Sequence, residues 1–471
     1  MLKYLKKYWY FAVLAAIFMM GEVLIDLYQP RMMERIVDEG ILGLSNNGVS
    51  DIDLIISTGI RMILIVAAGG ACGILSGVCT NVCGQNFGND LRKASFRNIM
   101  HFSFEQTDDF TTGSLITRTT GDVTQVQNMV QQLIRGFVRC MMFFIGGSTA
   151  LLSLDMNFSI IIAIALPVII LEILFIVWRT NPLFMLVQKK IDKMNSVIQE
   201  DIAGARVVKA FVQEDKEAER FQKHNKDLSD TQFKVLILMA YMAPVMNIVL
   251  NLAVVGIIYI GGIQVQAGAM APGKVMAAIT YISQILNGMM MLAMIFQTIS
   301  RGTTSAKRIN EVLRSEPAIR DGKGADGQVT ADSANAIEFK NVSFTYPGSK
   351  ANVLHDIDLR IKKGEMLAVI GATGCGKSTF VNMIDRFYDA TSGEVLIDGV
   401  PIKDYKLDKL RDKIAFVLQK SELFSTTIRE NIMIGKPGAT EDELKEAARA
   451  AQADDFIMQQ PEGYDTAVAQ S

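Results

Sequence analysis

The sequence predicts a chain in two parts: an α-helical domain that crosses a membrane six times, followed by an α/β domain. Three observations lead to this fold class. Half of the 471 residues are hydrophobic, a fraction that is high for a soluble protein. The long apolar runs lie within residues 1–300. Beyond them lies the sequence GATGCGKST at 371–379, a glycine-rich stretch ending in Lys-Ser-Thr that is typical of a phosphate-binding loop.

The boundaries of the two parts follow from composition. Residues 1–314 are expected to form the transmembrane domain, and 337–471 the α/β domain. Between them, 315–336 is rich in Gly, Asp, Ser and Ala without periodicity, which is typical of a linker. The net charge of −2 gives no indication of nucleic acid, and no such partner is expected. Three His argue against a histidine-rich metal site, and five Cys show no zinc-type pairing.

The membrane domain is predicted from apolar segments that each approach the ~20 residues needed to cross a bilayer. The first begins with Trp9 and Tyr10, aromatic residues that favour a membrane interface. It is too long for a cleavable signal and lacks a small-residue cleavage site. The predicted spans are 9–29, 54–82, 136–154, 158–178, 235–263 and 275–299.

Basic residues set the orientation of these spans. The segments after the second and fourth spans are long and basic, whereas the other three connections hold only Arg31, Arg35 and Lys274. The positive-inside rule therefore places both ends, the two long segments and the α/β domain in the cytoplasm. The predicted location is the cytoplasmic membrane of the cell, with membrane lipid as a partner.

The two long cytoplasmic segments, 88–110 and 186–228, carry apolar residues at helical spacing. They are expected to prolong the spans as helices. The stretches 110–123 and 201–211 are candidate turns that contact a cytoplasmic partner.

Charged residues inside spans are costly, so each raises a functional hypothesis. Glu22 and Asp26 lie four residues apart and share a helix face, and Arg61 lies at a similar depth in the second span. A structural pairing of the three is the main interpretation, and contact with a cationic or polar cargo is the alternative. The methionines of the last two spans permit an adaptable cavity, although packing and lipid contact explain them as well.

The stretch 371–379 is predicted to bind the phosphates of a nucleotide. It follows the apolar segment 365–371, expected to be a strand, and precedes a helix, which is the context of a P-loop NTPase domain. Glycines allow backbone N–H groups to turn toward the phosphates, and the helix N-terminus favours negative charge. Lys377 would contact the β- and γ-phosphates, Ser378 would ligate Mg²⁺ and Thr379 would support the α-phosphate. The expected nucleotide-binding residues of this loop are Gly371, Ala372, Thr373, Gly374, Cys375, Gly376, Lys377, Ser378 and Thr379.

Other elements of the α/β domain follow from similar patterns. Two strands around a turn are expected within 337–361, and further strands at 393–399 and 413–419. Tyr346 ends the first strand, where its ring could stack on adenine or lie at a surface turn. Gln419 ends the last strand, at the edge where α/β sheets bind ligands. Cys375 is interpreted as a packing choice, with a thiol-sensitive switch as the alternative.

Together these stretches resemble an exporter-type ABC transporter in which membrane and ATP-binding domains are fused, a half-transporter similar to multidrug exporters. The resemblance covers nearly the whole chain. The stretches that carry it are FTTGSLITRTTGDVTQV (110–126), SVIQEDIAGARVVKAF (196–211), FTYPG (344–348), GATGCGKST (371–379), SGEVLIDG (392–399) and VLQKSELFSTTIRENI (417–432).

The resemblance implies that ATP and Mg²⁺ are the cofactors. Tyr346 matches the aromatic residue that stacks on adenine, and Gln419 matches the glutamine that senses Mg²⁺ and the γ-phosphate. Segments 110–116 and 201–211 match the coupling helices. Such proteins pair with a second half-transporter, identical or different, and sandwich ATP between the two. The implied function is ATP-driven export of an unidentified drug-like, lipid or peptide substrate by alternating access.

One departure from the family pattern is clear. The sequence ends with PEGYDTAVAQS, a stretch that precedes the signature motif in the family. The expectation is therefore a truncated record with an incomplete ATP-binding domain. It would contain no catalytic residues, because the Walker B acid, the catalytic Glu and the switch His would be absent, and it would be inactive alone. The alternatives are an importer of the same fold, a non-transporting ATP-binding regulator and a gene remnant.

Overall fold

A computed structural model describes residues 1–322, 324, 334–419 and 422–468. Its packing divides the chain into two compact units. The first unit comprises Met1–Phe102 and Gln106–Glu316, and the second comprises Ser103–Glu105 and the chain from Pro317 onward. Each unit is described by itself.

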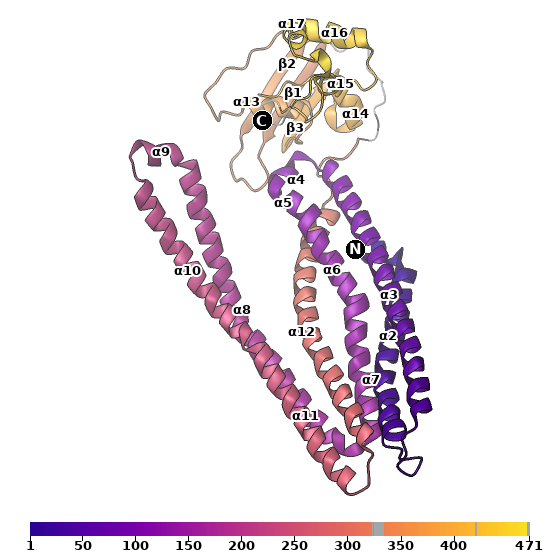
Figure 1. Cartoon of the computed structure of the whole chain (residues 1–471). Coiled ribbons are helices and arrows are strands. Elements are labelled where there is room, and N and C mark those ends of the chain that lie inside the picture. The colour runs from indigo at the N-terminus through magenta and orange to yellow at the C-terminus, as the bar shows by residue number, and fades with distance from the viewer. Residues whose placement is uncertain (323, 325–333, 420–421, 469–471) are drawn as a thin grey trace. The chain divides into compact units, whose positions relative to one another are not determined.

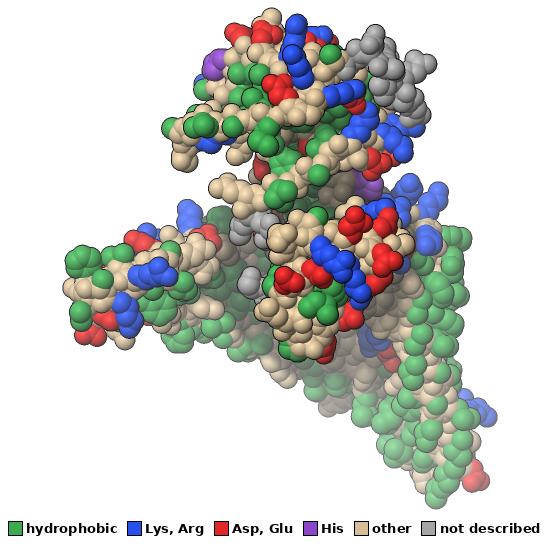
Figure 2. Space-filling view, turned by 90° about the horizontal axis from the view of Figure 1, so that it is seen from above, with side chains coloured by type: hydrophobic (Ala, Val, Ile, Leu, Met, Phe, Trp, Pro, Cys, Tyr) green, Lys and Arg blue, Asp and Glu red, His purple; other side chains and the backbone are tan. Residues whose placement is uncertain are grey.

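The first unit is helical, and six of its described helical segments are long and apolar enough to cross a membrane, which confirms the predicted spans. Hydrophobic side chains cover the flanks of these helices (Figure 2). The elements are α1 (Leu2–Lys6), α2 (Trp9–Arg35), η1 (Ile36–Ile41), α3 (Ile52–Met100), α4 (Phe104–Asp109), α5 (Thr112–Thr117), η2 (Arg118–Asp122), α6 (Val123–Gln131), η3 (Gln132–Phe137), α7 (Val138–Leu154), η4 (Met156–Phe158), α8 (Ser159–Ala203), α9 (Ala205–Ala210), α10 (Glu214–Ala240), α11 (Met242–Gln266) and α12 (Pro272–Arg314).

The spans continue well beyond bilayer thickness, as the sequence predicted. At 1.5 Å per residue the 49 residues of α3 extend about 74 Å, more than twice a hydrocarbon core of about 30 Å. The two expected turns contain short helices. Thr111 caps α5 by accepting a hydrogen bond from the Ser114 N–H. Gly204 lies between α8 and α9 and separates the two helices. The cytoplasmic parts of α8 and α10 run together as an arm that ends at α9 (Figure 1).

The core of the membrane unit lies where α2, α7, α8, α11 and α12 meet. Tyr281 is fully buried there, and its hydroxyl donates to the Leu27 carbonyl oxygen at 2.8 Å, so that the ring packs without an unsatisfied polar group. At the outer end, the buried Asp38 accepts a hydrogen bond of 2.6 Å from the Gly273 N–H. That N–H belongs to the first turn of α12, where backbone donors have no helical partner.

The second unit contains a four-stranded antiparallel sheet in the order β2-β1-β3-β4. The expected strands near 337–361 and 393–399 are confirmed. Phe380 of α13 stacks on Phe339 of the sheet with ring centroids 4.5 Å apart, and these rings anchor the domain core. The elements are β1 (Asn335–Phe344), β2 (Leu354–Lys362), α13 (Lys377–Ile384), β3 (Ser392–Ile397), β4 (Val400–Pro401), η5 (Ile402–Asp404), α14 (Leu407–Arg411), α15 (Ile428–Met433), α16 (Glu441–Ala450), α17 (Asp454–Met458) and η6 (Gly463–Asp465).

Two predictions about this sheet are wrong. The segments 365–371 and 413–419 are not strands in the described structure. Met366, Ile370 and Val417 are 96%, 94% and 91% exposed, so the apolar character that suggested central strands is not buried. A strand that is apolar on both faces forms when neighbouring strands pair with it. No described strand pairs with either segment in the sheet.

Candidate functional site

The predicted phosphate loop leads directly into α13, as expected. Gly374 and Gly376 have φ angles of +86° and +94°, a left-handed region that glycine adopts without steric cost. A Cβ on Gly376 would lie 3.1 Å from the Val353 carbonyl oxygen, so glycine is needed there for space as well. The loop therefore opens at the N-terminus of an eight-residue helix, where unpaired N–H groups and the helix dipole favour a phosphate.

Lys377 is the first residue of α13 and folds back over the loop. Its ammonium donates hydrogen bonds of 2.8 Å to the carbonyl oxygens of Gly371 and Ala372, and it lies 3.7 Å from the Cys375 sulfur. The Lys377 ammonium thus lies among the residues of the loop itself. It can exchange these carbonyl oxygens for the oxygens of a phosphate that enters the loop.

The next two residues, Ser378 and Thr379, have different environments. The Ser378 side chain is exposed, whereas Thr379 is buried and its hydroxyl lies 2.9 Å from the Tyr346 hydroxyl. The Tyr346 ring also makes edge contacts with Phe344 and Tyr388, at centroid distances of 4.9 and 5.2 Å. The structure therefore brings Tyr346 to the first turn of α13.

The remaining predicted residues are less tightly placed. Thr373 and Cys375 are exposed, and so is Gln419 at the end of its irregular segment. Gln419 forms no hydrogen bond with the described residues. Further along, burial raises the pKa of the Asp385 carboxyl at the C-terminal end of α13, an effect that Arg411 opposes.

The proposed pairing of Glu22 and Asp26 with Arg61 is wrong. Both carboxylates face Arg139 of α7 instead, at 3.2 Å for Glu22 and 3.7 Å for Asp26. Arg61 lines a separate cavity of about 450 Å³ at the outer end of α2 and α3, together with Arg31 and Arg35. The difference arises because helix rotation, which the sequence does not reveal, decides which span each face meets.

A larger cavity of about 670 Å³ lies between α3, the α6–η3–α7 segment and α12. Polar side chains dominate its lining, which includes three arginines and, among the described residues, no carboxylate. Of the methionines in the last two spans, Met291 lines this cavity, Met246 and Met289 are buried in the core, and Met239 and Met294 are exposed, so these side chains do not gather in one cavity. The lining residues are Gly77, Thr80, Asn81, Gln125, Asn128, Gln131, Gln132, Arg135, Gly136, Arg139, Met291, Thr298 and Arg301.

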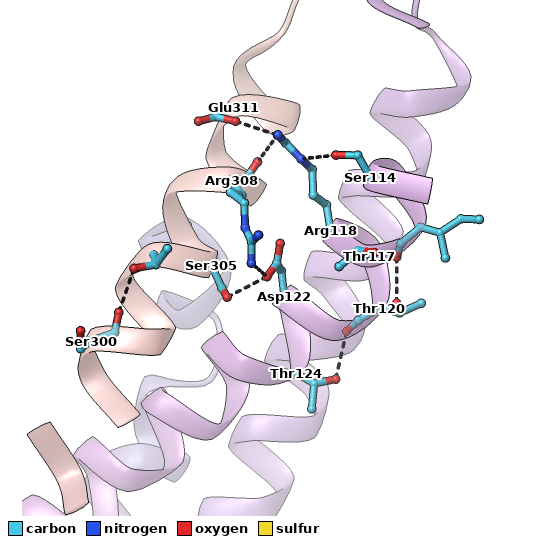
Figure 3. Close-up of polar contacts among 12 residues, drawn as sticks. Ser114, Thr117, Arg118, Thr120, Asp122, Thr124, Ser300, Ser305, Arg308 and Glu311 are labelled. Atoms are coloured by element: carbon cyan, nitrogen blue, oxygen red, sulfur yellow. Dashed lines mark hydrogen bonds and ion pairs between the residues drawn. The ribbon is translucent and has the colours of Figure 1, made fainter. Parts of the chain in front are cut away.

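A charged cluster that the sequence did not reveal joins η2 to α12 (Figure 3). The Asp122 side chain is 3% exposed, and its Oδ1 accepts from Ser305 Oγ at 2.7 Å and from Arg308 at 2.5 Å. Arg118 donates to the Arg308 carbonyl oxygen at 2.9 Å and to Glu311 at 2.7 Å. The one signal in the sequence is the spacing of 305, 308 and 311, which puts their side chains along one helix face.

Comparison with known proteins gives matches in both units. The family described as ABC transporter transmembrane region matches residues 12–290, and the family described as ABC transporter matches 354–468. The uncharacterized ABC transporter ATP-binding protein YfiB of Bacillus subtilis is 33% identical over 469 residues, which are 100% of this chain and 80% of that protein.

Two further relatives show the same level of similarity. The uncharacterized ABC transporter ATP-binding protein Rv1273c of Mycobacterium tuberculosis is 33% identical over 450 residues, covering 95% of this chain and 76% of its own. The ATP-dependent lipid A-core flippase of Syntrophus aciditrophicus is 33% identical over 412 residues, covering 87% and 68%. The expectation of a truncated record is not borne out by these comparisons.

Proposed function

The chain belongs to the ABC transporter family, and from this premise we propose that it is an exporter half-transporter that uses ATP to move a drug-like, lipid or peptide cargo out of the cytoplasm. It is a multi-pass membrane protein whose ATP-binding domain is cytoplasmic. The single observation that carries the proposal is the fusion, in one chain, of six apolar spans with a P-loop that opens onto a helix N-terminus.

The loop residues fit the phosphates of ATP. The two left-handed glycines leave a cradle that side chains would obstruct, and backbone N–H groups at the start of α13 are available as donors. Lys377 would exchange its carbonyl partners for the β- and γ-phosphates and offset their charge. The exposed Ser378 hydroxyl would ligate Mg²⁺, which prefers oxygen ligands and keeps several waters. That ion, when bound, neutralises charge that develops on the transferred phosphoryl group.

Tyr346 is proposed to support the adenine. Its hydroxyl is held by Thr379, so the ring orientation is set by the same helix turn that would bind the phosphates. The contact between Tyr346 and Thr379 would therefore fix the position of the adenine base relative to the phosphates. Gln419 is proposed to approach Mg²⁺ and the γ-phosphate in the nucleotide-bound protein.

A second half-transporter is the proposed partner. The arm formed by α8, α9 and α10 supports this proposal. Its outer faces expose Ile202, Val207, Phe211 and Val212, large apolar side chains near or within α9. Apolar side chains clustered at the end of a cytoplasmic arm favour docking on another protein surface. The segments 110–116 and 201–211 are proposed to be the coupling helices.

Transport in oriented vesicles tests this function. Inside-out vesicles that contain the protein should accumulate a labelled cargo when ATP is added, and the Lys377→Ala variant should not. Accumulation that requires right-side-out vesicles would identify an importer. ATP binding without turnover under any cargo would favour a regulator.

A further inference from the structure

The larger membrane cavity has a lining that specifies the kind of molecule it can hold. Its volume of about 670 Å³ is in the range of small-molecule sites. Five of its side chains lie on one continuous helix face, because they recur at intervals of three and four residues. These are Gln125, Asn128, Gln132, Arg135 and Arg139.

Of these five residues, Arg139 lies within the predicted span 136–154 and the other four precede that span on its cytoplasmic side. An ionisable residue inside a membrane span is a candidate for function. The opposite walls are also polar. Asn81 of α3 and Thr298 of α12 line the cavity, and the buried Thr80 hydroxyl has no hydrogen-bond partner among the described residues.

The charges in the cavity are not balanced within it. Arg139 is paired with Glu22 and Asp26, which lie behind the lining on α2. Arg135 and Arg301 have no ion pair with any described residue. Gly77 lies opposite Arg135, where an added Cβ would be 3.5 Å from a guanidinium nitrogen, an ordinary van der Waals contact. Two guanidinium groups therefore face polar space without a counter-ion.

The cavity changes character along the membrane normal. It lies at the cytoplasmic ends of the spans, because Asn81, Arg135 and Arg301 are close to the span ends that lead into the cytoplasmic helices. One turn toward the membrane centre, α3 and α7 carry apolar side chains beside the Glu22 carboxylate, which lies against Gly73 of α3. Ile74 precedes Gly77 on α3, and Phe143 follows Arg139 on α7, where its ring lies 5.5 Å from the guanidinium carbon.

We propose that this cavity receives an anionic amphiphile, with its phosphate- or carboxylate-bearing headgroup on Arg135 and Arg301 and its apolar part directed toward the membrane centre. Planar guanidinium groups bind such headgroups through paired hydrogen bonds. The same two guanidinium groups would repel a cationic cargo. The proposal rests on the export function proposed above and narrows its cargo to one chemical class.

The test uses the intact protein in nanodiscs of neutral lipid. Three probes are compared: a fluorescent short-chain phosphatidic acid, a phosphatidylcholine with the same chains and label, and inorganic phosphate. Binding is measured by fluorescence anisotropy for the lipids and by competition for phosphate. Phosphatidic acid should bind and stimulate ATP hydrolysis, and the other two probes should do neither in the same concentration range.

Variants then assign the site. Arg135→Gln and Arg301→Gln should each weaken phosphatidic acid binding about tenfold, as expected for the loss of one charge-assisted contact of about 1.4 kcal/mol. Arg135→Lys and Arg301→Lys keep the charge but lose the paired hydrogen bonds, so their affinities should lie between those of the unmodified protein and the Gln variants. Arg179→Gln is the matched control, since Arg179 is an exposed arginine near the cytoplasmic end of another span and does not line the cavity.

The outcomes separate this inference from the proposed function. Equal binding of the two lipids, unchanged affinity in the Gln variants, or equally tight binding of inorganic phosphate would overturn the inference. The binding measurement needs no ATP turnover, so it tests the cavity even if export fails. Conversely, cargo-stimulated hydrolysis that ignores headgroup charge would sustain export and reject the anionic amphiphile.

Discussion

A carboxylate oxygen of Asp122 in η2 lies 2.5 Å from a guanidinium nitrogen of Arg308 in α12, although the two residues are 186 positions apart in the sequence. The carboxylate is almost completely buried, whereas the arginine is half-exposed. The pair therefore fixes the inner end of α12 to the segment that follows the first predicted coupling helix.

Removal of this contact should destabilise the membrane unit. Arg308→Ala leaves the buried Asp122 with Ser305 alone, and a buried polar group that loses a partner costs about 1–3 kcal/mol. Thermal unfolding in detergent should show a lower midpoint, while Arg314→Ala on the same helix should not. A double variant with Asp122→Asn should recover part of the loss, and a loss that simply adds would contradict a direct interaction.

Lys377→Ala should abolish ATP hydrolysis and transport. The change removes the one cation that the described loop holds over its own backbone, in a site where electrostatic stabilisation is the largest catalytic contribution. Phosphate release from the purified protein provides the measurement. Near-normal turnover in the variant would show that the nucleotide site lies elsewhere.

Substitutions of Tyr346 should separate its two contacts. Tyr346→Ala should weaken ATP binding by about 1–3 kcal/mol, the value typical of base–aromatic stacking. Tyr346→Phe removes only the hydroxyl that contacts Thr379 and should cost less, and Tyr346→Trp should be tolerated. Equal affinity for ATP in all four proteins, measured by equilibrium binding, would place Tyr346 outside the site.

The two left-handed glycines of the loop provide a matched pair. Gly374→Ala should cost about 1–2 kcal/mol for a left-handed backbone alone, because a Cβ there meets nothing within 4 Å. Gly376→Ala adds the close approach to Val353 and should cost more. Nucleotide affinity and unfolding should both follow this order. The reverse order would mean that the loop conformation differs from the one described.

Glu22→Gln should act through Arg139. Polar contacts between membrane helices contribute about 0.6–1.7 kcal/mol, so the variant should lose stability of this order. Neutralising Arg139 in the same chain should return part of it. Arg61→Gln is the control, since Arg61 lies in the outer cavity. If Arg61→Gln rescued Glu22→Gln and the Arg139 change did not, the pairing seen here would be incorrect.

Much of this molecule could be predicted because the relevant signals are local. Apolar length identifies the spans. In the structure Thr440 and Glu443 form a capping box at the start of α16, and their spacing of three residues is a local signal of the same kind. The glycine and lysine spacing of 371–379 identifies the loop. The predicted roles of Tyr346, Ser378 and Gln419 toward a nucleotide remain predictions.

Other features depend on distant parts of the chain and could not be predicted. Glu22 meets Arg139 rather than Arg61 because the packing of α2 against α7 rotates its charged face toward that helix. The apolar pattern of 365–371 indicates a strand, yet a strand also needs hydrogen-bonding neighbours, and a segment's own residues do not specify them. The polar cavity likewise arises from three helices whose faces meet only in the folded unit.

The anchors at the two ends of α12 have a mechanical consequence. This helix has 43 residues and is therefore about 65 Å long. Asp38 holds its first turn at the outer end, and Asp122 holds it near the inner end. A long α-helix tilts more readily than it breaks, since every hydrogen bond of its interior opposes a sharp bend. We therefore expect α12 to move as one nearly rigid helix. A shift of η2 at the inner end of α12 would then also change the position of its outer end, next to Asp38.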